Sequence, residues 1–147
     1  MVDILHTIAA KAPQQEAWKA LATREGLAGW WTSDTRGNPS EGGIIEFRFN
    51  ENRMDMKVVK VDPGRHVVWQ VVRGPDDWLN TKISFDLSRN GDLTKVLFKH
   101  QGWREANEHM HHCSTKWGVF MLSLKSLLET GKGQAFPHDV WIEGVRN

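Results

Sequence analysis

The sequence contains no tyrosine, a single cysteine and no long hydrophobic run. Without tyrosine, no phenol is present to act as an acid or as a hydrogen-bond donor to an oxyanion. The one thiol, Cys113, rules out a disulfide within the chain and favours a reducing compartment, so we expect a cytoplasmic protein. No apolar stretch reaches the roughly 18 residues that a membrane span needs. Residues 1–10 lack the basic start and apolar block of a signal peptide, and we expect none.

The sequence also lacks a strong charge of either sign. Its 19 basic and 18 acidic residues leave a net charge of +1, and no basic run stands out. Neither nucleic acid nor an anionic membrane surface is therefore an expected partner. The 147 residues, 39% hydrophobic and 25% charged, predict one globular domain spanning residues 1–147.

The spacing of apolar residues predicts a sheet followed by a long helix. In residues 105–130 the apolar side chains recur every three or four positions, which places them on one face of a helix of about seven turns. Alternating patterns predict a strand at residues 2–9 and five more at 44–49, 53–61, 65–72, 78–87 and 93–100. Turn signals separate them, the strongest being Asn90-Gly91.

Two short helices are expected between the first strand and the others. Pro13 suits the first helical position of one, and Thr23 can cap the other. Residues 34–43 read as a loop, and Gly131 ends the long helix. The tail, residues 135–147, keeps apolar side chains and is expected to pack back on the body. The order β-α-α-β-β-β-β-β-α with short connections predicts an α+β fold in which a curved antiparallel sheet wraps around a long C-terminal helix.

Several segments resemble one known group of proteins. The matching pieces are residues 8–13 (IAAKAP), 16–21 (EAWKAL), 26–31 (GLAGWW), Gly42-Gly43 before a Phe-rich strand, Trp78, Gly102-Trp103 and residues 117–128. Together they resemble the START-like (SRPBCC) superfamily with the helix-grip fold, and within it the branch of activator-of-heat-shock-chaperone-ATPase homologues. The resemblance covers almost the whole chain. It implies a deep pocket between the long helix and the sheet, used in that superfamily for lipids, hormones, polyketides or aromatic molecules.

The resemblance and the aromatic content together suggest a lining for such a pocket. Eight tryptophans and six phenylalanines are present, and methionine adapts to irregular partners. The same side chains could instead fill a solid core. The expected ligand-binding residues are Trp30, Trp31, Phe49, Met54, Met56, Trp69, Phe85, Phe98, His100, Trp103, Trp117, Phe120 and Met121. Because adjacent residues of a short helix cannot both face one core, at least one of Trp30 and Trp31 is expected near the surface, as a pocket rim or interface anchor.

Three histidine and cysteine positions on the long helix raise other chemistry. His109, His112 and Cys113 have the spacing of metal ligands, but they do not converge well and no second cysteine or nearby carboxylate completes a site. We therefore expect no metal and no cofactor. Cys113 as a nucleophile needs a base, and His109 lies one helical turn away. A lone buried thiol is more often inert packing, so no catalytic residue is assigned.

Three functional hypotheses follow. The first is a carrier or sensor that binds a small hydrophobic or aromatic molecule between helix and sheet. The second, implied by the branch resemblance, is a partner module that acts on a chaperone ATPase. The third is a cyclase or hydrolase, which requires His6, Arg48 and His100 to converge in the cavity. Val119 and Leu122, on the back of the long helix, can contact either the tail or a second copy in a homodimer.

Overall fold

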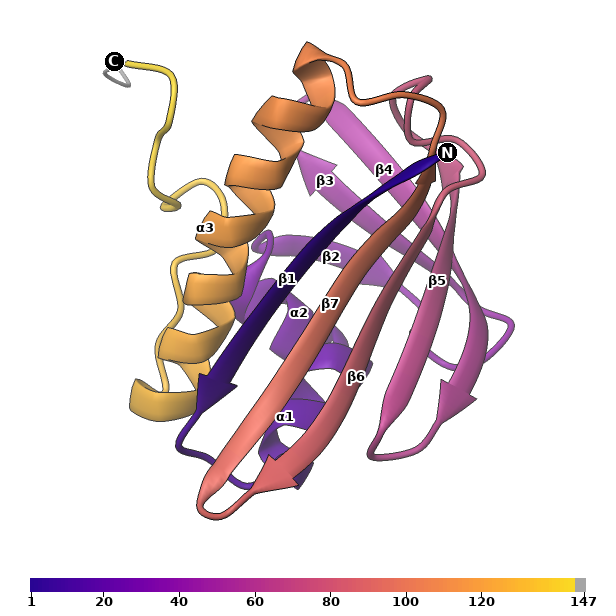
Figure 1. Ribbon diagram of the computed structural model, residues 1–147. Coiled ribbons are helices and arrows are strands. Elements are labelled where there is room, and N and C mark those ends of the chain that lie inside the picture. The colour runs from indigo at the N-terminus through magenta and orange to yellow at the C-terminus, as the bar shows by residue number, and fades with distance from the viewer. Residues whose placement is uncertain (145–147) are drawn as a thin grey trace.

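A curved seven-stranded antiparallel sheet holds one long and two short helices in the computed structural model, which describes residues 1–144 (Figure 1). The strand order is β1-β7-β6-β5-β4-β3-β2. The elements are β1 (Val2–Ala10), α1 (Gln14–Ala22), α2 (Arg24–Trp30), β2 (Asp34–Gly37), β3 (Ile44–Phe49), β4 (Asn52–Asp62), β5 (His66–Arg73), β6 (Lys82–Asn90), β7 (Leu93–Trp103) and α3 (Glu108–Thr130). The predicted α+β helix-grip architecture is confirmed.

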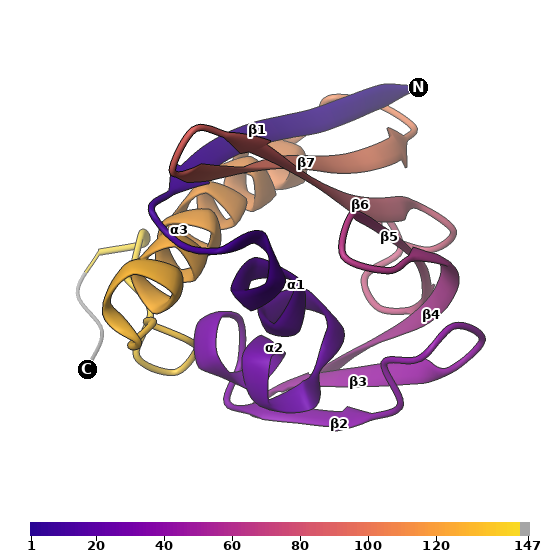
Figure 2. The ribbon, with the colours of Figure 1, turned by 90° about the horizontal axis from the view of Figure 1, so that it is seen from below.

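Seen from below, the sheet curls around α1 and α2 while α3 lies across its open side (Figure 2). Strand β1 pairs with β7 and so returns the start of the chain to its last strand. The expected turn at Asn90-Gly91 joins β6 to β7, with Gly91 at a φ of 63°, a conformation that glycine adopts without steric cost. Side chains on the concave face of the sheet pack against the helices, and those on the convex face meet solvent.

Several boundaries differ from the sequence prediction, and three of the differences have a clear physical reason. Residues Asp34–Gly37, expected in a loop, form the edge strand β2, whose short polar sequence carries no alternating pattern. Strand β6 begins at Lys82 because Trp78 lies in a turn, where its N–H donates to the Pro75 carbonyl. Helix α3 begins at Glu108 because the side chain of Asn107 caps it by accepting from the Met110 N–H at 2.9 Å. Two predicted end signals hold: Thr23 caps α2, and Gly131, at a φ of 81°, ends α3.

The core is mostly aromatic. Trp31 is the centre of this cluster, with ring centroids 4.2 Å from Phe47 and 4.9 Å from Trp117. The expectation that Trp30 or Trp31 lies at the surface is wrong, because they are 0% and 2% exposed. Trp31 ends α2, so α3 and the sheet both surround this position, and the two indoles stack 6.1 Å apart.

Candidate ligand-binding cleft

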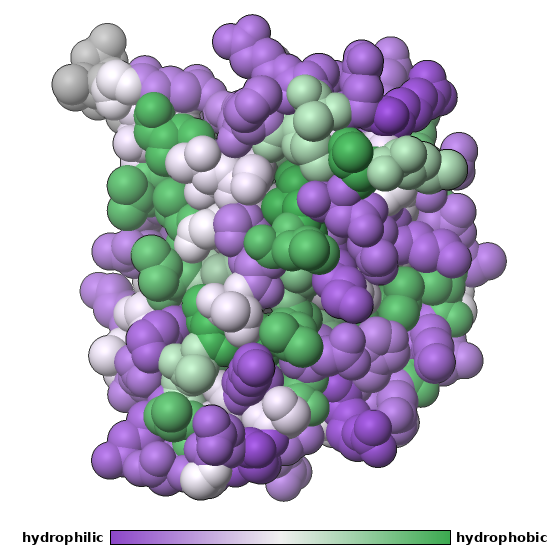
Figure 3. All heavy atoms as spheres, viewed as in Figure 1, coloured by the Kyte–Doolittle hydropathy of each residue, from purple (hydrophilic) through white to green (hydrophobic). Residues whose placement is uncertain are grey.

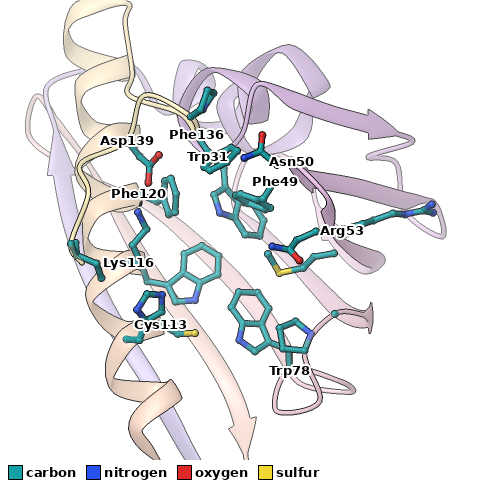
Figure 4. Close-up of a pocket in the computed structure, with 18 of the residues that line it drawn as sticks. Trp31, Phe49, Asn50, Arg53, Trp78, Cys113, Lys116, Phe120, Phe136 and Asp139 are labelled. Carbon is teal, nitrogen blue, oxygen red and sulfur yellow. Dashed lines mark hydrogen bonds and ion pairs between the residues drawn. The ribbon is translucent and has the colours of Figure 1, made fainter. Parts of the chain in front are cut away.

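A cleft of about 1380 Å³ opens beside α3, at the end of the sheet formed by β3, β4 and β5. One wall is α3, from His109 to Phe120. The opposite wall is the β3–β4 turn with the first residues of β4, together with Arg73 and the segment after β5. The tail, from Phe136 to Glu143, forms the third wall (Figure 4). The cleft is open at the side of the molecule, whereas the space directly beneath α3 is filled by core side chains. The expected position of the pocket, between the long helix and the sheet, is therefore corrected to the side of the helix.

Aromatic rings are the commonest apolar side chains in the lining of the cleft. The large apolar side chains that line it are Trp31, Phe49, Met54, Trp78, Trp117, Phe120, Phe136, Trp141 and Ile142. The indoles of Trp78 and Trp117 are nearly parallel, at 20° and 5.9 Å, and Phe49 meets Phe136 at 5.2 Å. Each ring is held by other rings, so the surface is formed before any ligand arrives. Rigid aromatic walls favour planar apolar molecules, which can stack on them.

The tail is tied to the body by main-chain hydrogen bonds and an ion pair. The Phe136 N–H donates to the Trp31 carbonyl at 2.8 Å, and the Ser33 N–H donates to the Phe136 carbonyl at 3.0 Å. The Lys116 ammonium pairs with the Asp139 carboxylate, donates to the Val140 carbonyl at 3.2 Å, and lies 5.0 Å from the Phe120 ring centroid (Figure 4). The Asp139 side chain is 1% exposed, so this pair is shielded from water and holds the third wall in place.

His100 fixes the floor of the cleft from below. The imidazole is 0% exposed; its Nδ1 accepts from the Trp117 indole N–H at 3.1 Å, and its Nε2 lies 2.8 Å from the Thr81 hydroxyl. Because that hydroxyl donates to the Trp78 carbonyl at 2.6 Å, Nε2 must be the protonated nitrogen. Burial lowers the pKa of His100 to about 3, so the ring stays neutral and links Trp117 to the turn that carries Trp78.

The structure brings five of the thirteen expected ligand-binding residues to the cleft: Trp31, Phe49, Met54, Trp117 and Phe120. The other eight do not line the cleft and belong to the packed core or its buried polar network: Trp30, Met56, Trp69, Phe85, Phe98, His100, Trp103 and Met121. Sequence reasoning did not place Trp78, Phe136 or Asp139 in the site. The apolar character of the tail was the one signal for Phe136, since it indicated that the tail packs on the body.

The two histidines of the candidate metal site, His109 and His112, pair with different carboxylates. His109 Nδ1 lies 3.0 Å from Asp77, and His112 Nδ1 lies 2.8 Å from Glu143. Within residues 1–144, no group of three or more His, Cys, Asp or Glu side chains is arranged to hold a metal ion.

The groups required for the cyclase or hydrolase hypothesis do not converge. Arg48 pairs with Glu46 on the convex face at 3.0 Å, whereas His100 is enclosed in the core. His6 lies 3.3 Å from the Ser114 hydroxyl, between β1 and α3. We do not carry that hypothesis forward.

Comparison with known proteins places the chain in a family. The model described as "Activator of Hsp90 ATPase homolog 1-like protein" matches residues 11–129. The chain belongs to this family. The resemblance to the START-like superfamily and to this branch is therefore confirmed. No curated protein sequence matches the chain significantly. In the part of the chain that the structure describes, no helix is both long and apolar enough to cross a membrane.

Solved structures agree with this assignment. The solution structure of the Aha1 dimer from Colwellia psychrerythraea is 45% identical, with a TM-score of 0.84 over 90% of this chain and 100% of that one. SSP2350 from Staphylococcus saprophyticus is 17% identical, with a TM-score of 0.76 over 90% and 95% of the two chains. CalU16 from Micromonospora echinospora is 18% identical, with a TM-score of 0.71 over 85% and 73%. The last two share the fold alone.

Proposed function

We propose that this family member binds a small hydrophobic or aromatic molecule in the cleft beside α3 and acts as a carrier or sensor. The observation that carries the proposal is the cluster of aromatic side chains, among them Trp31, Trp117 and Phe120, at the wall of a cleft of about 1380 Å³. Apolar walls with a few polar groups at the edge are typical of small-molecule sites. Membership of a superfamily that commonly binds hydrophobic ligands supports the same reading.

The packing of the walls favours binding without a large ordering cost. Trp31 is held between Phe47 and Trp117, and Trp117 is fixed by its hydrogen bond to His100. A ligand therefore does not have to immobilise these rings, and such preorganisation raises affinity. Each apolar Å² that a ligand covers contributes about 25 cal/mol, so a bicyclic aromatic molecule that buries ~200 Å² of apolar surface gains roughly 5 kcal/mol before entropic costs.

The test uses 8-anilino-1-naphthalenesulfonate, a fluorescent aromatic probe, and a variant that fills the cleft. A Cβ atom at Gly74 would lie 3.4 Å from Met54 Cγ and 3.9 Å from Trp78 Cβ, which are ordinary contacts. Gly74→Leu should therefore fold and occupy the space between these two lining residues. We expect it to weaken probe binding by at least about tenfold, a loss of roughly 1.4 kcal/mol. The matched control is Ser88→Leu on the convex face, which should bind the probe as the unaltered protein does.

Failure would be equally clear in this experiment. If the unaltered protein does not bind the probe, or if Gly74→Leu and Ser88→Leu bind it equally well, the cleft is not the binding site. If only Gly74→Leu weakens probe binding, a thermal-shift screen of aromatic molecules that displace the probe identifies the ligand class. The single reduced thiol fits the cytoplasmic location that we also propose.

The second candidate function is that of a module that acts on a chaperone ATPase. The description of the matching family model favours it. On the convex face, Lys57, Lys60, Lys82, Lys95 and Lys99 offer cations to an acidic partner surface. A pull-down with a chaperone of the Hsp90 type and an ATPase assay test this function directly. Neither binding nor stimulation at micromolar concentrations would remove it.

We also propose that two copies of the chain form a homodimer through the back of α3. The similar protein from Colwellia psychrerythraea is described as a dimer. Leu122 is 63% exposed on α3, and hydrophobic patches lie over α3 and β1 on the face shown in Figure 3. Leu122→Glu should convert the dimer to a monomer in light scattering after size exclusion, whereas Gln15→Glu on α1 should not. The proposal would be contradicted if the unaltered protein stays monomeric over a 100-fold range of protein concentration.

A further inference from the structure

Three side chains beside the cleft form a continuous hydrogen-bonded series that ends at the only thiol. Cys113 Sγ lies 3.4 Å from His109 Nε2, and His109 Nδ1 lies 3.0 Å from Asp77 Oδ2. Cys113 and His109 come from successive turns of α3, whereas Asp77 comes from the segment between β5 and β6. A nucleophile, a base within reach of it and a third group that orients the base are the elements of an activated thiol.

The direction of each hydrogen bond follows from the chemistry of its partners. A carboxylate can only accept, so His109 Nδ1 carries a proton and donates it to Asp77. In the neutral ring Nε2 is then the unprotonated nitrogen, and it faces the Cys113 S–H as an acceptor. Asp77 is itself fixed by Asn107, the cap of α3, whose amide donates to it at 3.2 Å. The hydrogen bond from His109, followed by that from Asn107, lowers the pKa of Asp77, so the orienting group stays ionised.

Cys113 is a neutral thiol at rest. Burial raises its pKa to about 11, with the Asp77 charge acting in the same direction and the Trp78 indole opposing both. The thiol therefore reacts at neutral pH only if a base removes its proton as the sulfur attacks. His109 is the base in contact with it, and His112 is directed to Glu143 on the tail instead.

The Trp78 indole lies beside the thiol. Trp78 is 6% exposed, lines the cleft and faces Cys113 (Figure 4). Its N–H acts on Cys113 as a hydrogen-bond donor that lowers the thiol pKa, against the larger effect of burial. This donor favours negative charge on the sulfur as the proton leaves it.

We propose that Cys113, His109 and Asp77 make the cleft a site of covalent thiol addition to electrophilic ligands, of the class of α,β-unsaturated carbonyl compounds and quinones. This rests on the proposed ligand-binding function and adds the chemical class of the ligand. The S–H proton passes to His109 Nε2 as Cys113 Sγ bonds to the β-carbon of the ligand. The C=C electron pair shifts to the α-carbon and carbonyl oxygen, which gives an enolate. His109 then returns the proton to the α-carbon, so that one S–H and one C=C are replaced by one S–C and one C–H with no oxidant.

The test measures modification of the intact protein by N-ethylmaleimide, a Michael acceptor, using mass spectrometry. Because Cys113 is the only cysteine, each added maleimide reports this thiol. The reaction should proceed at pH 7, well below the pKa of about 11 of the thiol, because His109 accepts the proton as the sulfur attacks. His109→Gln should slow the reaction at pH 7 by about 10²-fold or more, since a positioned base typically contributes that much. Asp77→Asn should lower the rate by a smaller factor.

The matched control is His111→Gln, which removes an exposed imidazole from the same helix at a position that does not line the cleft. Its rate and pH profile should equal those of the unaltered protein. Equal rates and profiles for the unaltered protein and His109→Gln would overturn the proposal, as would a thiol that reacts only after unfolding in urea. Binding of the anilinonaphthalene probe is measured separately. Probe binding without His109-dependent reactivity removes the thiol proposal alone, whereas reactivity without probe binding removes the ligand-binding proposal alone.

Discussion

At the scale of single residues, the site depends on polar groups that are satisfied in only one arrangement. His100 accepts from Trp117 and donates to Thr81, whose hydroxyl continues the series to the Trp78 carbonyl. Such a buried network stabilises one geometry because an unpaired member is costly in a medium of low dielectric constant. Since Trp117 and Trp78 both line the cleft, the neutral state of one imidazole controls the shape of the binding surface.

The depressed pKa of His100 predicts a loss of stability in mild acid. The folded protein holds this ring neutral down to about pH 3, whereas the unfolded chain protonates it near its ordinary value of 6.5. Between these values the unfolded state binds the extra proton, so the free energy of unfolding falls as the pH falls. The contribution of His100 amounts to about 2 kcal/mol between pH 7 and pH 5.

Urea unfolding at the two pH values measures this contribution. His100→Gln, which keeps a donor and an acceptor but does not titrate, should show about 2 kcal/mol less pH dependence than the unaltered protein. His138→Gln, at an exposed position, should behave as the unaltered protein does. Identical pH dependence in all three proteins would show that His100 titrates normally.

At the scale of elements, the spacing of apolar residues predicted the helices and strands that have one buried face. The long amphipathic helix, the five alternating strands after residue 44 and the turn at Asn90-Gly91 all form. The edge strand β2 could not be predicted, because its polar residues are ordered by pairing with β3 and not by a buried face of their own. The start of α3 was set three residues too early because the Asn107 cap, and not the apolar pattern, decides where the helix begins.

The tail is an element that the ion pair between Lys116 and Asp139 helps to hold against α3. Lys116→Met keeps the length of the side chain but removes the ammonium that faces the nearly fully buried Asp139 carboxylate. Loss of the ammonium removes the attraction between α3 and the tail at this point, so the tail should detach from α3 more often. Amide hydrogen exchange at Phe136, whose N–H donates to the Trp31 carbonyl, should then accelerate by about 10- to 100-fold.

Two comparisons complete the experiment on the tail. Lys132→Met, at an exposed lysine beyond α3, should leave the exchange rate of Phe136 unchanged. The amide of Val58, in the middle of the sheet, should remain protected in both variants, because the effect is local. Unchanged exchange at Phe136 in Lys116→Met would show that the main-chain bonds alone hold the tail.

At the scale of the whole molecule, the cleft depends on contacts between segments far apart in the sequence. Trp31, Met54, Trp78, Trp117 and Phe136 come from five different parts of the chain, and no local pattern distinguishes them from core residues such as Trp69. Sequence therefore predicted the kind of side chain that lines the site and the fold that holds it. The packing of α3 and the tail against the sheet determines which aromatic residues line the cleft. The position of Asp77 beside His109 likewise appears only once the segment after β5 meets the start of α3.

The most direct test of ligand binding follows the indole N–H signals of the eight tryptophans by ¹H–¹⁵N NMR while the anilinonaphthalene probe is added. Binding in the cleft predicts concentration-dependent, saturable shifts at Trp31, Trp78 and Trp117, whose rings line it. The signals of Trp18 on α1 and Trp103 in the core should move little, because neither lines the cleft. Shifts confined to Trp18, or no saturable shift at any of the three cleft tryptophans, would contradict the central claim that this cleft is a binding site.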